Sequence, residues 1–380
     1  MDFSPNETQA LVQKTARDFA ERVILPRAAA IDASEAMPGE VLRGLGDLGL
    51  MAVNVPPDLG GAGAGAVAYA LAVQEVARAC ASTAVTMSVS NMVGETIARF
   101  GTAAQKDRYC PVLARGDQGL GCFALSEPDA GSDPGAMKST AKPDAGDWVL
   151  CGSKQWVSGG SAAAVLIVWA RTAPADAGAR GISCFLVEQG AHGLHFGRPE
   201  DKMGLRGSST VPIELADCRV PAHALLGQEN EGFKVAMMAL DGGRIGISSQ
   251  AIGIARAALE ESVRFAKDRH AFGVAIGNHQ AIQAKLADMH TQIEAAQLLT
   301  LRAAWLKEGR RPFTREASMA KLFASEMAVR VCNEAVQIHG GYGYTRDFPA
   351  ERHLRDARVT TIYEGTSEIQ RLVIARSALA

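Results

Sequence analysis

The sequence lacks any apolar run long enough to cross a membrane. Its longest uninterrupted apolar stretch, residues 162–170, is far shorter than the roughly 20 residues of a spanning helix. The first five residues contain neither the basic segment nor the apolar segment of a secretory signal. These absences predict a cytoplasmic protein with no membrane partner.

Closely spaced cysteines are also missing. The seven cysteines are scattered, odd in number and without a C-x-x-C pair. This pattern argues against a disulfide framework and predicts reduced, mostly buried thiols. The eight histidines show no metal-ligand spacing, so no metal site is expected.

An excess of charge of one sign is absent as well. The net charge of -2 comes from 39 basic and 41 acidic residues that are well mixed along the chain. Such a chain has no electrostatic footprint for DNA or RNA, so nucleic acid is not expected as a partner. The sequence has no Walker A loop and no G-x-G-x-x-G after a strand, which leaves a Rossmann site unsupported.

The patterns that are present divide the chain of 380 residues into three parts. Helical periodicity extends from Glu7 to about Ala114 and returns at Gly232 in long segments at 233–268, 280–308 and 314–339. Between them, β-branched and aromatic runs alternate with turn clusters, with strands expected near 148–150, 165–169, 182–187 and 211–215.

We therefore predict an α+β fold that is mainly α. Its expected units are an N-terminal helical domain (1–115), a middle antiparallel β-barrel or sandwich domain (116–225) and a C-terminal four-helix bundle domain (226–380).

The C-terminal part contains a distinctive run of loops and helices. Thr314 is the expected N-cap of a helix that Gly340 and Gly341 end. Further on, Glu364 stands between Tyr363 and Gly365 just before the last helix, for which Thr366 or Ser367 is the expected N-cap. On these residues alone, Glu364 is either a positioned base or a solvated carboxylate on a capped surface turn.

Two longer motifs decide between these readings. The stretch from Gln337 to Arg371 resembles the C-terminal signature of the acyl-CoA dehydrogenases, and residues 350–353 and 363–375 are closest to the short-chain (butyryl-CoA) type. Phe123 to Asp133 matches the other family signature, including its S-E-P and G-S-D elements. The two occur in the right order about 200 residues apart, and the resemblance covers nearly the whole chain.

The resemblance implies an FAD-dependent dehydrogenation of a short-chain acyl-CoA to the trans-2-enoyl-CoA, a step of the fatty-acid β-oxidation type. The glutamate matching Glu364 is the base that takes the α-proton as the β-hydrogen leaves as hydride to flavin N5. Isovaleryl-CoA and long-chain relatives carry their glutamate one residue before the arginine matching Arg244, where this chain has Gly243.

The resemblance also assigns roles to other positions. Residues expected at the flavin of the same chain are Phe123, Leu125, Ser126, Trp156, Ser158, Thr366 and Glu368. Residues expected to serve the FAD of a neighbouring subunit are Arg269, Phe272, Gln280, Gln337 and Gly341. Residues expected near the substrate are Ser132, Asp241, Arg244, Tyr363 and Gly365.

Without the family, several of these residues have simpler explanations. The segment 126–133 would be a turn, Trp156 would be a core tryptophan before a hairpin turn, and Asp241 with Arg244 would be an ion pair on one helix face. For the segment 269–273, the resemblance implies a contact with the pyrophosphate end of a neighbour's FAD, and an arginine suits that role because a guanidinium is always charged and offers paired donors. Ala275 stands where the family often has proline.

The expected assembly is a homotetramer built as a dimer of dimers, and the expected electron acceptor is an electron-transferring flavoprotein. Two rivals remain open at this point. One is an acyl-CoA oxidase that passes electrons to O2. The other is an FAD-binding protein of the same fold that acts outside β-oxidation.

Overall fold

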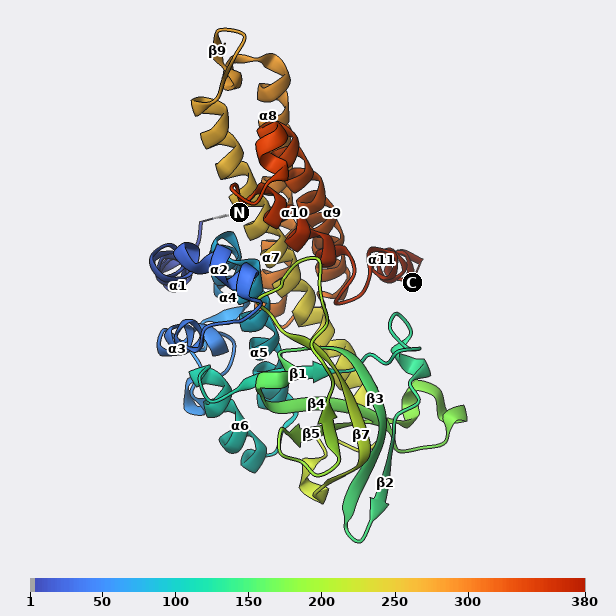
Figure 1. Cartoon of the computed structure of the whole chain (residues 1–380). Helices are drawn as coiled ribbons and strands as arrows, with labels where there is room; N and C mark the ends of the chain where they lie inside the picture. The colour runs from blue at the N-terminus through green and yellow to red at the C-terminus, as the bar shows by residue number, and fades with distance from the viewer. Residues whose placement is uncertain (1–3, 380) are drawn as a thin grey trace.

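A computed structural model describes residues 4–379 of the chain. In it, a sheet of seven strands lies between two helical regions in the sequence (Figure 1). The expected absence of a targeting segment concerns residues 1–5, of which 1–3 lie outside the described residues. No helix within residues 4–379 has both the length and the apolar character that a membrane crossing requires.

Six α-helices form the N-terminal region: α1 (Glu7–Phe19), α2 (Ala28–Ser34), α3 (Gly39–Asp47), α4 (Gly65–Ala79), α5 (Ala81–Phe100) and α6 (Ala103–Arg115). Helices α4 and α5 are rich in small residues and buried on almost every side. Helix α5 contacts both the sheet and the long helix α7 (Gly232–Asp268). The start of α7 also contacts the sheet directly, since Trp169 Nε1 donates to Gly232 O at 2.7 Å.

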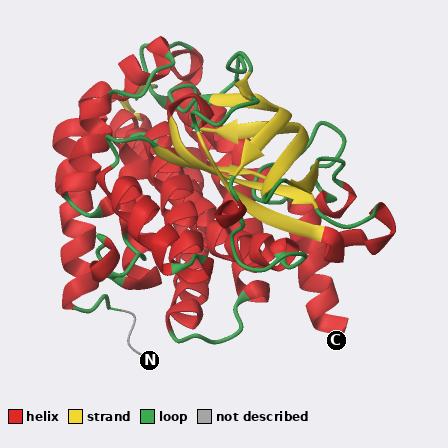
Figure 2. Cartoon of the chain, turned by 90° about the horizontal axis from the view of Figure 1, so that it is seen from below, coloured by secondary structure: helices red, strands yellow, loops and turns green. Residues whose placement is uncertain are grey.

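The sheet contains β1 (Leu120–Ala124), β2 (Thr140–Asp144), β3 (Asp147–Ser158), β4 (Ala163–Arg171), β5 (Ile182–Glu188), β6 (Leu194–Phe196) and β7 (Thr210–Val220). Their order is β1-β4-β2-β3-β7-β6, with β5 also paired to β4. The four expected strand segments are confirmed in β3, β4, β5 and β7. Figure 2 shows the strands gathered on one side of the helices.

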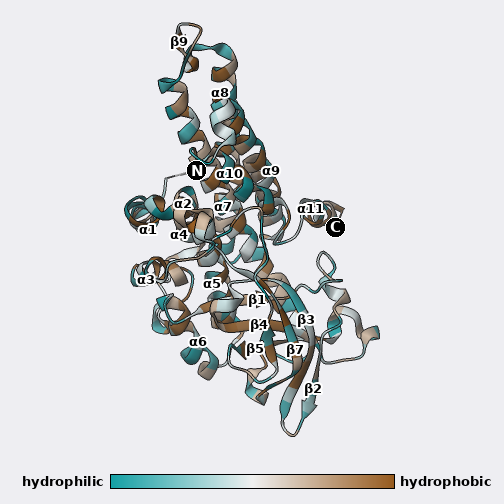
Figure 3. Ribbon diagram, viewed as in Figure 1, coloured by the Kyte–Doolittle hydropathy of each residue, from teal (hydrophilic) through white to brown (hydrophobic). Residues whose placement is uncertain are grey.

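The middle β domain is confirmed and most of its strand pairs are antiparallel, but the prediction of an antiparallel domain is wrong for the pairs that β4 forms with β1 and β2. Strand β1 runs parallel to β4, and β2 meets β4 in parallel at Thr140 and Arg171. The reason lies in β4, which is buried along almost its whole length and shows no alternation of polar and apolar residues. Such a run is typical of a central strand that is covered on both faces, and Figure 3 shows it as a hydrophobic band.

Three long helices dominate the C-terminal region, and the predicted segments are confirmed to within a residue: α7, α8 (Gln280–Glu308) and α9 (Thr314–His339). The shorter helices α10 (Ala350–Arg358) and α11 (Ser367–Leu379) pack against α9. A small hairpin, β8 (His270–Ala271) and β9 (Val274–Ala275), joins α7 to α8 at the end farthest from the sheet (Figure 1).

The caps of these helices test three expectations. Gly340, with φ +58°, ends α9, and Thr366 Oγ1 accepts from Ile369 N at 3.3 Å, so both predictions are confirmed. The assignment of Thr314 as an N-cap is wrong. Phe313 occupies that position without a side-chain bond, while the Thr314 hydroxyl donates to Asp241 Oδ2 at 2.5 Å. A tertiary partner on α7 has replaced the local cap.

Candidate active site

The candidate base Glu364 lies in a strained turn between α10 and α11. Its φ is +54°, and Gly365 follows with φ +90°. A left-handed backbone costs a residue other than glycine about 1–3 kcal/mol and persists where the surrounding structure enforces it. The amide N–H of Glu364 donates to no acceptor among residues 4–379. The turn therefore presents both a carboxylate and a free N–H.

The carboxylate of Glu364 is largely withdrawn from solvent. Its Oε2 is buried and has no hydrogen-bond partner in the described structure. Burial raises the pKa of Glu364 to about 7, although the charges of Arg244 and Lys321 act in the opposite direction. A carboxylate with a pKa near neutrality suits general-base chemistry. The alternative of a solvated surface glutamate is wrong.

Gly243 on α7 faces this carboxylate. A Cβ atom added at Gly243 would lie 2.6 Å from Glu364 Oε2 and 2.9 Å from Met92 Sδ. Glycine in a helix interior costs up to about 1 kcal/mol relative to alanine. Here its missing side chain leaves the room that the Glu364 carboxylate occupies.

Asp241 and Arg244 form the ion pair that their spacing on α7 suggests. Arg244 Nη1 lies 2.6 Å from Asp241 Oδ1 and 3.3 Å from Ser318 Oγ. Arg244 is buried, and its Nε has no partner among the described residues. The pair thus brings a buried cation close to Glu364, and its contact with a substrate stays a prediction.

In the β domain, the segment after β1 is joined to β3. Gln155 N donates to Ser126 O at 2.9 Å. The register of β3 against β7 shifts between Lys154 and Val157, and Trp156, inside this irregularity, has φ +65° and a side chain 61% exposed. The alternative of a core tryptophan is therefore wrong. An exposed flat ring beside Ser126 fits a flat, partly apolar cofactor.

The remaining β-domain positions differ in what they expose. The ring of Phe123 packs on Trp169 with centroids 4.4 Å apart, and Leu125 is buried, so their main chain is the part available to a ligand. Ser158 is half-buried at the end of β3, and Ser132 is exposed in the loop after β1.

A buried ion pair that the sequence did not indicate stabilises this loop. Glu127 accepts from Lys154 Nζ at 2.8 Å and from the backbone N atoms of Lys138 and Ser139 at 2.6 and 3.0 Å. Lys154 is fully buried and also donates to Leu125 O at 3.3 Å. The glutamate of the S-E-P element therefore fixes the backbone on which Ser126 is presented.

The residues expected to serve a neighbour's FAD gather elsewhere. Arg269 lies over the ring of Tyr342, with Cζ 5.6 Å from the centroid, and Phe265 stacks on His339 at 4.4 Å, which brings the ends of α7 and α9 together. Arg269, Phe272, Gln280, Gln337 and Gly341 are all exposed, with Phe272 at 95%. The hairpin β8–β9, at whose turn Phe272 stands, lies at the end of the molecule away from the sheet (Figure 1).

This second cluster also fits part of a dinucleotide cofactor. It offers an exposed guanidinium for a phosphate, an exposed aromatic ring, and bare backbone, since a Cβ at Gly340 or Gly341 would meet nothing within 4 Å. That this cluster serves the FAD of a neighbouring chain stays a prediction.

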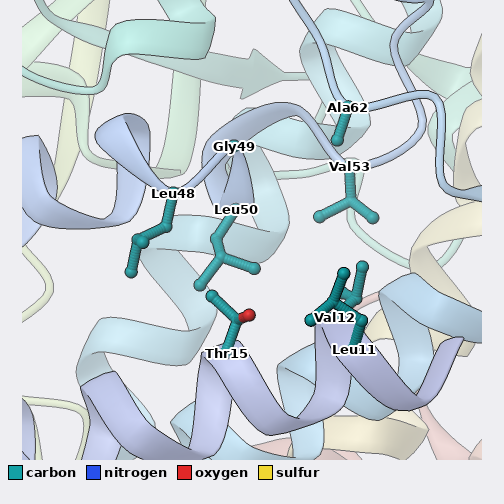
Figure 4. A pocket seen from close by; sticks show the side chains of 8 residues that line it. All are labelled: Leu11, Val12, Thr15, Leu48, Gly49, Leu50, Val53 and Ala62. Carbon is teal, nitrogen blue, oxygen red and sulfur yellow. The ribbon is translucent and has the colours of Figure 1, made fainter. Parts of the chain in front are cut away.

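A separate apolar pocket of about 170 Å³ lies between α1 and the segment after α3 (Figure 4). It is lined by Leu11, Val12, Thr15, Leu48, Gly49, Leu50, Val53 and Ala62. None of these side chains is ionisable, so the pocket carries no acid-base chemistry of its own.

Two polar side chains near Glu364 were not predicted. Lys321 on α9 and Gln370 on α11 are both fully buried, and both donate to the carbonyl oxygen of Gly365, at 2.7 and 2.9 Å. A signal for Lys321 exists in the sequence, because it stands on the buried face of α9 with Ala317 and Ala324. Nothing local distinguishes Gln370.

Three family models match consecutive parts of the chain. They are the acyl-CoA dehydrogenase N-terminal domain (residues 6–117), middle domain (122–218) and C-terminal domain (230–379). A curated relative, the mitochondrial short-chain specific acyl-CoA dehydrogenase of Bos taurus, is 50% identical over 370 residues, covering 97% of this chain and 89% of the relative.

Solved structures agree with these matches. Butyryl-CoA dehydrogenase from Megasphaera elsdenii superposes with a TM-score of 0.97 at 41% identity, and 100% of each chain is covered. A structure described as the electron transferring flavoprotein of Acidaminococcus fermentans matches with a TM-score of 0.98 at 42% identity, again over 100% of both chains. The chain belongs to the acyl-CoA dehydrogenase family of FAD-dependent oxidoreductases.

Proposed function

We propose that this protein dehydrogenates a short-chain, unbranched acyl-CoA to the trans-2-enoyl-CoA, with Glu364 as the base. The observation that carries the proposal is the buried, unpartnered Oε2 of Glu364 in a strained turn against Gly243. Its similarity to butyryl-CoA and short-chain specific enzymes supports the acyl length.

The chain's own groups account for removal of the α-proton. A thioester α-proton is only weakly acidic, so the base needs a raised pKa, and burial raises the pKa of Glu364 to about 7. The free N–H of Glu364 is a donor for the thioester oxygen, where negative charge develops as the proton leaves. Because the base must be ionised, we expect the rate to fall as the pH decreases through about 7.

FAD would be held by the Ser126 and Trp156 segments, with Ser158, Thr366 and Glu368 as further lining residues. When bound, it supplies the acceptor for the hydride that leaves the β-carbon. We propose an electron-transferring flavoprotein as the next electron carrier, supported by the similarity to the Acidaminococcus structure described by that name.

Anaerobic titration of the purified flavoprotein with acyl-CoAs of increasing length tests the function. We expect butyryl-CoA to bleach the flavin band more completely than long-chain acyl-CoAs, and an electron-transferring flavoprotein to restore the band faster than air does. Failure of any acyl-CoA to bleach the band would contradict the function. Rapid peroxide formation at the turnover rate in air would instead favour an oxidase.

We also propose that the chain assembles into a tetramer, as a dimer of dimers, in which each FAD site includes Arg269, Phe272, Gln280, Gln337 and Gly341 of a neighbour. Two observations support the proposal: these residues are exposed, and the hairpin β8–β9, at whose turn Phe272 stands, lies at the end of the molecule away from the sheet that contains Trp156 (Figure 1). A cytoplasmic location is supported by the seven free cysteines, six of them buried.

Arg269→Ala should lower FAD occupancy by removing the guanidinium expected to contact phosphate. A lost charge-assisted bond costs about 1.5–3 kcal/mol, which is a roughly 10- to 100-fold weaker affinity for FAD. Flavin absorbance per subunit and sedimentation measure occupancy and assembly together. Arg264→Ala, in the last turns of α7 shortly before Arg269 and paired with Glu261, is the matched control. A stable monomer of Arg269→Ala with full FAD content would refute the assembly proposal.

A further inference from the structure

The turn that carries Glu364 is tied to the surrounding helices on both sides. On one side, the Tyr363 hydroxyl donates to Gln250 Oε1 on α7, and Gln250 Nε2 donates to Ala81 O at 2.9 Å. The residue before the base is thereby connected through α7 to the start of α5.

On the other side, the two carbonyl groups of the turn are held by side chains. Gln370 Nε2 donates to Glu364 O at 3.2 Å and to Gly365 O at 2.9 Å, and Lys321 Nζ donates to Gly365 O at 2.7 Å. These bonds fix the left-handed φ of both Glu364 and Gly365, which an isolated chain would avoid.

The use of a lysine for this task is costly. Lys321 is fully buried, and it forms no ion pair within 4.0 Å with a carboxylate of residues 4–379. Burying an ammonium group costs several kcal/mol even after relaxation, and apolar residues of similar volume often replace buried charges without loss of stability. An apolar side chain would avoid this cost, so what the lysine adds is its bond to the Gly365 carbonyl and its charge.

The charged groups around Lys321 point to the base. Glu364 faces it from the turn, Arg244 from α7, Glu368 from α11 and Glu326 from its own helix. Burial lowers the pKa of Lys321, while these carboxylates, Glu364 first, act to raise it and so favour the ammonium form. The ammonium in turn favours the ionised form of Glu364, against the effect of burial.

We propose that Lys321 is a positioning residue for Glu364: it holds the Glu364–Gly365 turn through the Gly365 carbonyl and, as an ammonium, keeps the Glu364 carboxylate ionised. This inference rests on the proposed role of Glu364 as the base. Lys321 lies on α9, outside the two family signatures, and its proposed role is to orient the Glu364 carboxylate and to favour its ionised form.

The test compares Lys321→Met with Lys321→Arg in the FAD-loaded enzyme. The pH dependence of anaerobic flavin reduction by butyryl-CoA is measured together with FAD content and thermal midpoint. Lys321→Met removes both the donor and the charge. We expect its reduction rate to fall about 10- to 100-fold at a pH where the base is ionised, because a small misplacement has effects of this size.

We also expect the pH midpoint below which reduction slows to rise by about one pH unit in Lys321→Met. A nearby cation lowers the pKa of a carboxyl group by about one to three, and this variant removes that cation. The thermal midpoint should stay equal or rise. Lys321→Arg keeps a donor and a permanent charge, so its pH midpoint should lie at or below that of the wild type, with most of the rate restored. Lys285→Met, which removes a lysine paired with Glu334 outside the site, should change neither quantity.

An unchanged rate and an unchanged pH midpoint in Lys321→Met with full FAD would overturn the proposal. If the Met variant is not recovered, Lys321→Arg decides, because an upward shift of its pH midpoint contradicts the role of the charge. Glu364→Gln separates the two claims. A normal rate of flavin reduction in Glu364→Gln would contradict the role of Glu364 as the base. Loss of reduction in Glu364→Gln together with a normal rate and pH midpoint in Lys321→Met would contradict only the role of Lys321.

Discussion

Glu364→Gln is expected to slow flavin reduction by a short-chain acyl-CoA by at least about 10²–10⁴, the usual range for a lost general base. Glutamine keeps the shape of the side chain and its place against Gly243, but it cannot accept the α-proton. The backbone of the turn, with its bonds from Lys321 and Gln370, is not altered by the change. Stopped-flow absorbance of the flavin band measures the effect.

The matched control is Glu334→Gln, which removes a carboxylate of α9 that pairs with Lys285 outside the site. It should reduce at the wild-type rate. FAD content should be the same in wild type and both variants, because the proposed loss concerns the proton and not the cofactor. Near-normal reduction by Glu364→Gln would remove Glu364 from the mechanism.

The second large effect is expected when the base is moved from the turn to α7. In a Glu364→Gly background, Gly243→Glu should recover part of the lost rate, at least about tenfold within the range of general-base catalysis. We expect this recovery because a Cβ atom at Gly243 would lie 2.6 Å from the position that Glu364 Oε2 occupies in the wild type. The other close neighbour, Met92 Sδ at 2.9 Å, belongs to a flexible side chain.

Three proteins decide this prediction by stopped-flow reduction: the wild type, Glu364→Gly and the double variant. The preferred acyl length should shift in the double variant, since the carboxylate then approaches from a different part of the backbone. Gly243→Glu alone should be slow, because it places a second carboxylate against the first. A double variant with bound FAD and no recovery would contradict the geometric equivalence of the two positions.

Much of the fold was predictable because its signals are local. The long helices α7, α8 and α9 follow directly from apolar spacing of three and four residues, and Gly340 marks the end of α9. The parallel pairing of β1 with β4 was not predictable, because it depends on which strands meet. Thr314 failed as a cap for a similar reason, since its partner Asp241 is far away in the sequence.

The candidate site divides in the same way. Glu364 was found because it belongs to a long signature, and the exposure of Trp156 depends on a local irregularity in β3 that only the structure reveals. The supporting bonds from Lys321 and Gln250 cross from α9 and α7 to the turn. No local pattern predicts such contacts, although a lysine on the buried face of a helix indicates that its ammonium group has a specific partner.

The central claim is that Glu364 removes the α-proton, and the measurement that isolates this step is hydrogen exchange without oxidation. A 3-thia-acyl-CoA has sulfur in place of the β-carbon, so its α-hydrogens can leave while no hydride can. Incubated in D2O with the holoenzyme and analysed by mass spectrometry, this analogue should gain deuterium at the α-carbon rapidly with the wild type and at least about 10² times more slowly with Glu364→Gln. Equal exchange in the two proteins, at equal FAD content, would contradict the account.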